Sequence, residues 1–220
     1  MDVKRAKPPL FSIVVVHYQG TIPHAIYQRG IRSLLEQTFR DFEILCYHDG
    51  PLLEPNLEFL VPIRATSARF NNYGHSLRDI GIHEASGEYI LHFNADNVLY
   101  SDALEAIAKE ISRESVLLDE NTNLPLATND MILFPIVLAD RVAFRSNLFR
   151  KPGLGLYVIL TGHPPKLGNI DCMQLVMKRE LWLKEGGWRD KTRNGDGIMY
   201  EKFCRRYGYR SVGAVLGEHH

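Results

Sequence analysis

A run of apolar, mostly β-branched residues near the start of the chain constrains the fold more than any other feature. Across residues 10–16, the only polar side chain is that of Ser12. Such a run is typical of a central parallel strand whose two faces are both buried. The sequence therefore predicts an α/β fold in this part of the chain.

The pattern that follows alternates helices with strands. In chain order, we expect a helix opened by Thr21 and Pro23, a strand at 42–47, a short strand at 61–64, a helix at 74–85, a strand at 88–93 and a helix capped by Ser101. Strands that alternate with helices form βαβ units, whose strands lie parallel. We therefore predict an α/β domain with a mostly parallel central sheet.

The second half of the chain is less regular. Its expected elements are strands at 131–138 and 141–144, a long loop at 150–168, a strand at 172–177, helices at 179–184 and 196–206, and a last strand at 210–216. The loop carries several glycines and prolines, which interrupt regular structure. Because loops of this length in a compact domain are usually functional, we interpret it as part of a substrate site.

Composition and charge exclude several classes of protein. With 26 basic and 26 acidic residues, the chain has no net charge, which argues against nucleic acid as its main partner. Cys46, Cys172 and Cys204 form no Cys-x-x-Cys pair and are expected to be buried, reduced thiols of a cytosolic protein. The apolar run at 10–16 is too short to span a bilayer. We expect a protein that is neither secreted nor transmembrane, and docking on a membrane surface stays open.

Polar residues follow three of the predicted strands. The loops after Val16, Tyr47 and Phe93 are expected at one edge of the sheet, where open α/β sheets bind their ligands. In the last of these loops, Asp96 is a single carboxylate between the amides of Asn94 and Asn97. Such a group suits Mg²⁺ or Mn²⁺ that carries a phosphorylated substrate. The first hypothesis is a metal-assisted enzyme that acts on a nucleotide.

Several motifs, in this order, resemble the family 2 glycosyltransferases of the GT-A fold. They are the first strand with its polar end (11–19), a helix ending in Ser-x-x-x-Gln-Thr (33–38), a strand ending in His-Asp-Gly-Pro (41–51) and the segment Ala-x-Gly-Glu-Tyr-Ile (85–90). A looser match, at 179–188, precedes an acidic residue and a helix. Together the motifs cover about half of the chain and are specific, whereas each alone is weak.

The resemblance implies an enzyme that transfers a hexosyl group from a nucleotide-diphosphate sugar, with inversion and with Mn²⁺ or Mg²⁺. It implies a GT-A domain in which residues 1–112 bind the donor and residues 113–220 bind the acceptor. The acceptor is expected to be a saccharide or a lipid-linked sugar, as in polysaccharide biosynthesis. The expected location is the cytoplasm, with the inner face of the membrane as an alternative.

The resemblance also assigns donor-binding roles. Asp49 stands where similar enzymes accept a hydrogen bond from the nucleobase, and Tyr18 and Gln19 stand beside the base and ribose. Arg78 is expected to reach the diphosphate, and Asp96 matches the last carboxylate of the Asp-x-Asp metal motif. Structural alternatives stay open: turn carboxylates for the two aspartates, core packing for the tyrosine and a surface ion pair for the arginine.

Five residues depart from the family pattern. His48 stands where the family usually has Asp, and Pro51 replaces the usual Ser, so base and ribose contacts are expected to differ. Gln19 replaces the usual Asn, and Val16 the usual Pro. Asn94 stands where the first carboxylate of the metal motif is expected. One carboxylate can hold a cation whose other ligands are phosphates and water, but with one anionic contact fewer we expect weaker metal binding.

On the acceptor side, the resemblance assigns three further residues. Asp196 stands before the last helix, where family members carry the general base; its alternative role is a helix N-cap. Trp188 stands where it would shape an acceptor pocket, or it is an ordinary buried tryptophan. His219 stands where some similar enzymes have a metal ligand, or it belongs with His220 to a frayed chain end.

Other functions fit the sequence less well. A catalytically weak nucleotide-sugar-binding protein on the same fold is the main alternative, motivated by Asn94 and His48. A nucleotidyltransferase is disfavoured because residues 16–21 contain only Gly20 where a glycine-rich phosphate loop is needed. A dinucleotide-dependent dehydrogenase is disfavoured because no Gly-x-Gly-x-x-Gly follows the first strand.

Overall fold

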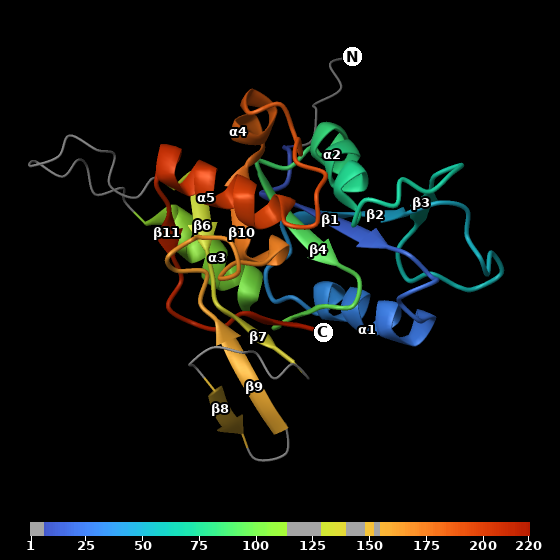
Figure 1. The fold of residues 1–220 in the computed structure, drawn as a ribbon, viewed down its shortest axis with the longest axis horizontal. Coiled ribbons are helices and arrows are strands. Elements are labelled where there is room, and N and C mark those ends of the chain that lie inside the picture. Colours follow the sequence, from blue (N-terminus) through green and yellow to red (C-terminus); the bar gives the residue numbers. More distant parts are fainter. Residues whose placement is uncertain (1–6, 114–128, 140–147, 152–154) are drawn as a thin grey trace, which may run out of the picture.

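The computed structural model describes residues 7–113, 129–139, 148–151 and 155–220, and its centre is a sheet of seven strands (Figure 1). The strand order is β11-β6-β10-β4-β1-β2-β3. Strands β4, β1, β2 and β3 run parallel, β10 is antiparallel to both of its neighbours, and β6 and β11 pair in parallel. The predicted mostly parallel sheet is confirmed. Its strands are β1 (Phe11–His17), β2 (Phe42–His48), β3 (Ile63–Ala65), β4 (Tyr89–Asn94), β6 (Met131–Leu133), β10 (Leu175–Lys178) and β11 (Arg210–Ser211).

A second sheet of five strands, in the order β5-β12-β7-β9-β8, lies beside the first. Its strands β8 and β9 lie apart from the central sheet at the bottom of Figure 1. Strand β12 lies between β5 and β7, so the last residues of the chain pair with the segment that follows Asp96. The strands are β5 (Val98–Leu99), β7 (Ile136–Leu138), β8 (Leu148–Lys151), β9 (Gly155–Leu160) and β12 (Gly217–His219).

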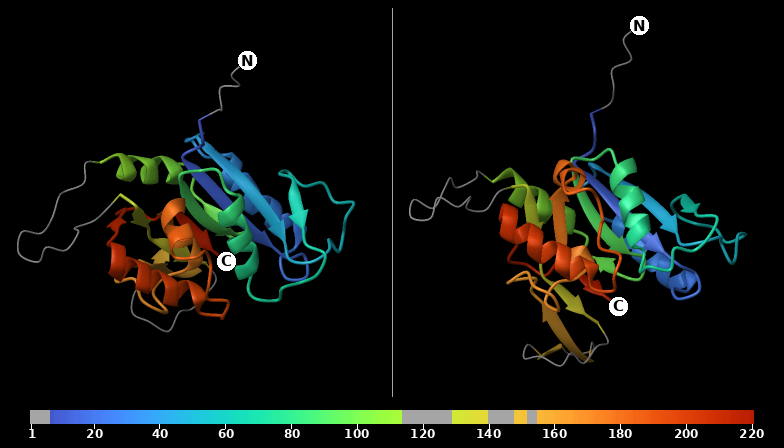
Figure 2. Two further views of the ribbon diagram at one scale, coloured as in Figure 1. Left: turned by 90° about the horizontal axis from the view of Figure 1, so that it is seen from above. Right: turned by 45° about the horizontal axis from the view of Figure 1, so that its top comes forward.

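Helices cover both faces of the central sheet, with α1 on one side and α2, α4 and α5 on the other (Figure 2). The side chains of β1 alternate between two cores, as the pleat of a strand requires. Ile13 and Val15 pack in one core with α1 and α3, whereas Val14 and Val16 pack in the other with α2, α4 and α5. The first strand is therefore buried on both faces, as its sequence predicts. The helices are α1 (His24–Leu35), α2 (His75–Glu84), α3 (Ala103–Ser112), α4 (Arg179–Lys184) and α5 (Gly195–Tyr207).

The predicted elements of the first half are confirmed to within a few residues, except for two caps. Thr21 does not cap α1, whose N-cap is Pro23, with no capping hydrogen bond from a side chain. Ser101 does not cap α3: the N-cap is Asp102, and its side chain makes no capping hydrogen bond. In the second half, the strand predicted at 131–138 is interrupted at Pro135, because proline has no N–H to give to a ladder. The strand predicted at 172–177 begins instead as a short 3₁₀ helix, Cys172–Gln174.

Two predictions for the second half are wrong over longer stretches. The loop predicted at 150–168 starts instead as a hairpin of β8 and β9, because β9 finds backbone partners in both β7 and β8. The strand predicted at 210–216 is only β11, after which the chain turns and pairs again as β12. The strand predicted at 141–144 lies outside the described residues.

Candidate functional site

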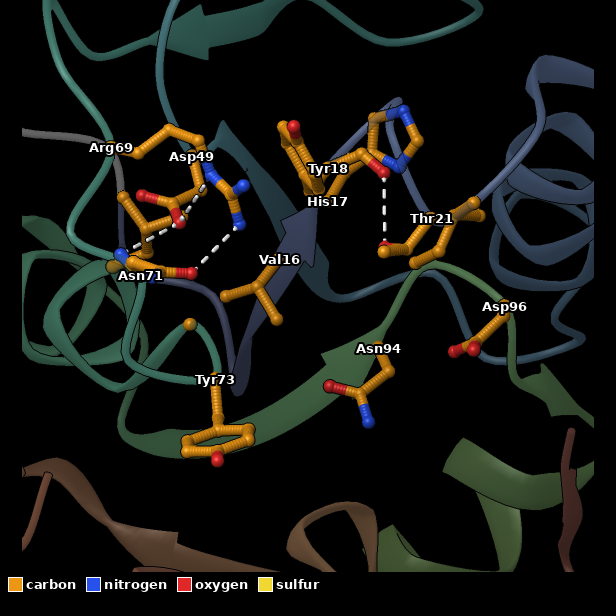
Figure 3. Close-up of a pocket in the computed structure, with 13 residues that line it drawn as sticks. Val16, His17, Tyr18, Thr21, Asp49, Arg69, Asn71, Tyr73, Asn94 and Asp96 are labelled. Atoms are coloured by element: carbon orange, nitrogen blue, oxygen red, sulfur yellow. Dashed lines mark hydrogen bonds and ion pairs between the residues drawn. The ribbon is translucent and has the colours of Figure 1, made fainter. Parts of the chain in front are cut away.

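A pocket of about 540 Å³ opens at the carboxyl ends of β1, β2 and β4, the sheet edge at which the sequence predicts a ligand crevice (Figure 3). Val16 and Leu77 give it an apolar surface. Asp49 lines it on one side and Asp96 on another, and the segment 69–74 contributes a further wall. The volume falls within the usual range for small-molecule sites, about 300–1,000 Å³.

Asp49 is buried at the end of β2 and holds the segment 69–74 in place. Its Oδ1 accepts the backbone N–H of Phe70 at 2.8 Å, and its Oδ2 accepts that of Asn71 at 3.2 Å. Each carboxylate oxygen can accept more than one hydrogen bond, so the side chain retains acceptor capacity toward the pocket. Asp49 is thus both a structural contact and a candidate ligand contact.

Arg69 and Tyr18 form a flat stack beside Asp49. The Arg69 guanidinium carbon lies 3.6 Å from the centre of the Tyr18 ring, and its Nε lies 3.6 Å from Asp49 Oδ2 (Figure 3). Planar groups of this kind pack well against a planar, aromatic ligand. The sequence analysis missed Arg69, because the only local signal is a basic residue before an asparagine-rich stretch.

Gln19 and His48 join the ends of β1 and β2. Nε2 of His48 accepts the backbone N–H of Gln19 at 3.0 Å, and Nδ1 lies 2.8 Å from the carbonyl oxygen of Gly50, to which it donates. Oε1 of Gln19 accepts the N–H of Leu53. The histidine thus has a structural role, and the predicted donor contact of Gln19 stays a prediction because its side chain bonds to the protein.

Asp96 carries the clearest chemical signal in the pocket. Its Oδ1 is buried, and no described residue donates a hydrogen bond to it. Burial raises the pKa of Asp96, while nearby His219 lowers that pKa. A buried carboxylate oxygen without a partner is costly unless a cation or donor satisfies it. Asp96 therefore fits a hard divalent cation such as Mn²⁺ or Mg²⁺.

His219 lies close to Asp96 because β12 returns beside β5. His219 is the last residue of β12 and is therefore not part of a frayed chain end. Its Nδ1 lies 3.4 Å from Oδ2 of Asp171, a carboxylate that the sequence analysis did not consider. The three side chains offer oxygen and imidazole donors of the kind that Mn²⁺ accepts, but their ligand atoms do not all lie within 4.8 Å of one another.

Asp196 lies in a second acidic group, at the start of α5. One carboxylate oxygen each from Asp171 and Asp196 and Sγ of Cys172 lie within 4.8 Å of one another. Burial, and then the charge of Asp171, raise the pKa of Asp196. The helix N-cap is Asn194, so the N-cap alternative for Asp196 is wrong. Burial also holds the pKa of the Cys172 thiol well above its usual range, which disfavours a thiolate ligand.

Arg78 links the pocket wall to the polar end of β4. Its side chain is only 2% exposed. Nη1 donates to the carbonyl oxygen of Tyr73 at 2.7 Å, and Nη2 donates to Oδ1 of Asn94. Arg78 does not line the pocket, so its predicted contact with a diphosphate stays a prediction.

Trp188 is fully buried, between His75 and Trp182. The ring centres lie 5.0 Å and 5.5 Å apart, and both pairs are stacked. Nε1 of Trp188 donates to the carbonyl oxygen of Asp190. In this structure Trp188 offers no exposed face, so an acceptor contact through stacking stays a prediction.

Residues 12–119, the segment that forms most of this pocket, match the family model of glycosyl transferase family 2. This segment belongs to the family. The fold of the chain resembles that of S. aureus TarS 1-349, with 12% identity, a TM-score of 0.64 and coverage of 94% of this chain and 59% of that one. No curated protein matches it in sequence.

Two further GT-A glycosyltransferases share the fold. The mannosyltransferase PcManGT from Pyrobaculum calidifontis, solved with GDP-Man and Mn²⁺, has 13% identity and a TM-score of 0.61, over 96% of this chain and 57% of that one. GalNAc-T7, solved with UDP, GalNAc and Mn²⁺, has 12% identity and a TM-score of 0.62, over 97% of this chain and 44% of that one. The present chain thus spans about 44–59% of these proteins. Among its described residues, no helix is long and apolar enough to cross a membrane.

The structure positions Asp96 through close packing of α1 against the turn 95–97. Nη2 of Arg29 donates to the carbonyl oxygen of Asp96 at 2.8 Å. A Cβ added at Gly30 would clash with the carbonyl oxygen of Ala95 and lie 3.0 Å from that of Asn97. The absence of a side chain at position 30 therefore sets the height of the Asp96 turn above the helix.

We expect Gly30→Ala to destabilise the protein by about 1–3 kcal/mol, the usual cost of overpacking, although alanine is the better helix former. It should also weaken Mn²⁺-dependent donor binding, because the backbone that must move carries Asp96. Urea unfolding and Mn²⁺ titration measure the two effects. Gly81→Ala in α2 is the matched control. Its added Cβ would clash with Val14 of β1, so this variant should lose stability without the added metal defect. Equal metal effects in both variants would contradict this account.

Proposed function

We propose that this glycosyltransferase moves a hexosyl group from a nucleotide-diphosphate sugar to a hydroxyl of a saccharide or lipid-linked acceptor, with inversion. The observation that carries the proposal is one pocket with a flat polar site at one end, Tyr18, Arg69 and Asp49, and the unpartnered Asp96 oxygen at the other. TarS has been solved with UDP-GlcNAc, and PcManGT with GDP-Man and Mn²⁺, which supports a donor of this class.

In this proposal, the two ends of the pocket bind two parts of the donor. The nucleobase stacks beside Tyr18 and Arg69 and donates a hydrogen bond to Asp49. Asp96 and His219 would hold Mn²⁺ or Mg²⁺, whose charge would neutralise that of the leaving diphosphate. Residues 1–112 bind the donor and residues 113–220 the acceptor. The three cysteines are free and buried, which is compatible with the cytoplasm or the inner face of a membrane.

Asp196 is the general base of the proposed reaction. The acceptor hydroxyl gives its proton to the Asp196 carboxylate as its oxygen bonds to the anomeric carbon. The bond to the diphosphate breaks on the opposite side of that carbon, which inverts its configuration. A raised pKa suits this role, because a base works best when its pKa approaches the working pH.

The pH profile should report this base. Asp196 must be ionised to act, and its pKa is raised, so kcat should fall with decreasing pH through a value above about 3.9, the ordinary aspartate pKa. Asp171→Asn removes a neighbouring negative charge and should shift this acid limb to lower pH. Steady-state rates from pH 4 to pH 8 measure the shift. A shift of the acid limb to higher pH in Asp171→Asn would contradict the assignment of Asp196 as the base.

Donor binding is tested by thermal shift with UDP, GDP, UDP-GlcNAc and GDP-mannose, each with and without Mn²⁺. A ligand at 100 times its Kd stabilises the folded state by about 2.7 kcal/mol. We expect at least one nucleotide sugar to raise Tm, and more so with Mn²⁺. No shift with any probe would contradict the proposal.

The second candidate function is a catalytically weak nucleotide-sugar-binding protein. The specific observation in its favour is Asn94, whose side-chain oxygen bonds to Arg78 and which supplies no carboxylate. Both candidates predict donor binding, and turnover separates them.

A further inference from the structure

The segment that walls the pocket between β3 and α2 has an unusual backbone. Asn71, Tyr73 and Gly74 all have left-handed backbone angles, with φ of 54°, 60° and 77°. Asparagine and glycine adopt this conformation readily, but a tyrosine does so only at a cost in free energy. A glycine at position 73 would avoid that cost. Such strain persists only where the surrounding structure fixes it, and it is concentrated at functional sites.

The surrounding structure does fix this segment. The carbonyl oxygen of Tyr73 accepts the buried guanidinium of Arg78, and Asp49 accepts two backbone N–H groups from the same segment. Asn72 bonds through its side chain to both the backbone N–H and the hydroxyl of Ser76. A Cβ at Gly74 would lie only 3.0 Å from Val16, so the backbone is seated closely on β1. The backbone of Tyr73 is thus held at a fixed place.

Burial does not account for that ring. The Tyr73 residue is 64% exposed, and its described aromatic contact is a tilted one to His75, with ring centres 6.0 Å apart. It lines the pocket nonetheless, on the other side of Val16 from Tyr18 (Figure 3). Tyr73 therefore carries a backbone cost without gaining the packing energy that a buried tyrosine would supply.

The position of Tyr73 indicates which part of a ligand it meets. Nε2 of His75, beside it, donates to the carbonyl oxygen of Thr192 at 2.8 Å, in the loop that leads to Asp196. Tyr73 thus lines the pocket next to a residue that contacts the loop of the proposed base, and it lies on the other side of Val16 from Tyr18 (Figure 3). In a donor that spans these sites, the hexosyl group is the part that lies there.

We propose that Tyr73 is a donor-specificity residue whose ring packs against the hexosyl group of the nucleotide sugar. This inference rests on the proposed function. The C–H face of a pyranose is apolar and packs on the tyrosine ring, while the phenol hydroxyl reaches a sugar hydroxyl. Because the backbone is already fixed, binding does not require the segment to be ordered.

The test compares nucleotide sugars with the matching nucleoside diphosphates. The Kd values of UDP, UDP-GlcNAc, GDP and GDP-mannose are measured with Mn²⁺ for the wild-type protein and four variants. Tyr73→Gly removes the ring and the strain, Tyr73→Asn keeps a residue that tolerates the left-handed backbone, and Tyr73→Phe keeps the ring. Phe70→Ala is the matched control, because Phe70 is an exposed aromatic of the same segment that does not line the pocket.

We expect Tyr73→Gly to raise Tm and to weaken nucleotide-sugar binding at least tenfold, with diphosphate binding unchanged. Tyr73→Asn should show the same selective loss, and Tyr73→Phe and Phe70→Ala should stay within threefold of wild type. The inference would be overturned if the ratio of the nucleotide-sugar Kd to the nucleoside-diphosphate Kd stayed unchanged in both Tyr73→Gly and Tyr73→Asn. This includes the case in which both ligands bind more weakly by the same factor. If the wild-type protein binds no probe, the proposed function fails and this inference falls with it.

Discussion

Asp196→Asn is expected to lower glycosyl transfer by about 10²–10⁴-fold, the usual contribution of a general base. The amide cannot take the acceptor proton, yet it keeps the size and much of the hydrogen bonding of the carboxylate. Oδ1 of Asp196 accepts the N–H of Gly197 at 2.7 Å, and an amide oxygen can replace it there. Asp196 does not line the donor pocket. Binding of the nucleotide sugar should therefore stay close to that of wild type.

Single-turnover transfer and donor Kd, measured on the same preparation, separate the two effects. Asp102→Asn is the matched control, since Asp102 also stands at the start of a helix and makes no side-chain capping bond. Its transfer rate should match wild type. Transfer at the wild-type rate in Asp196→Asn would show that another group takes the proton.

Asp96→Asn is expected to abolish the gain in donor affinity that Mn²⁺ provides, a loss of at least about tenfold, or about 1.4 kcal/mol. The substitution removes the one carboxylate of the motif at residues 94–96, because position 94 is already an amide bonded to Arg78. His219 and Asp171 remain, but the pocket-lining oxygen without a partner is that of Asp96. Metal-independent binding of the nucleobase end should persist.

The same variant should be more stable than wild type when no metal is added. Burial raises the pKa of Asp96, so ionisation of this group costs stability as the pH rises through its folded-state pKa. An uncharged asparagine avoids that cost at neutral pH. Thermal unfolding in a metal chelator should give a higher Tm, and Mn²⁺ should raise the Tm of wild type but not of the variant. An equal response to Mn²⁺ in both proteins would contradict the assignment of Asp96 as a ligand.

Local patterns were sufficient to predict the elements that build the donor side. The apolar run of β1 requires burial on both faces, and the two cores of Ile13 and Val14 satisfy that requirement. The polar ends of β1, β2 and β4 predicted the edge at which the pocket lies. These features depend on neighbours in sequence, so a single sequence carries them.

The second half of the chain depends on long-range pairing, which local patterns do not encode. The antiparallel pairing of β12 with β5 brings His219 near Asp96, a proximity that the family resemblance suggests but that no local pattern near residue 219 encodes. Asp171 and Arg69 were missed for the same reason: neither belongs to a motif, and each gains its place only through contacts with distant residues.

The structure also explains two departures from the family pattern. His48 replaces a carboxylate with a ring that bonds on both sides, to the N–H of Gln19 and the carbonyl oxygen of Gly50. Asn94 accepts from the buried guanidinium of Arg78, which also fixes Tyr73. Both residues have structural partners that the sequence alone did not show.

The most direct test of the central claim is donor turnover. Purified protein is incubated with Mn²⁺ and each nucleotide sugar that binds in the thermal-shift panel, and release of the nucleoside diphosphate and the anomeric configuration of the sugar product are followed by NMR. We predict that a bound donor is consumed, by transfer or by slow hydrolysis, with the sugar appearing as the anomer opposite to that of the donor, and that Asp196→Asn abolishes this release. Saturating donor binding with no diphosphate released would contradict the account and establish the binding protein instead.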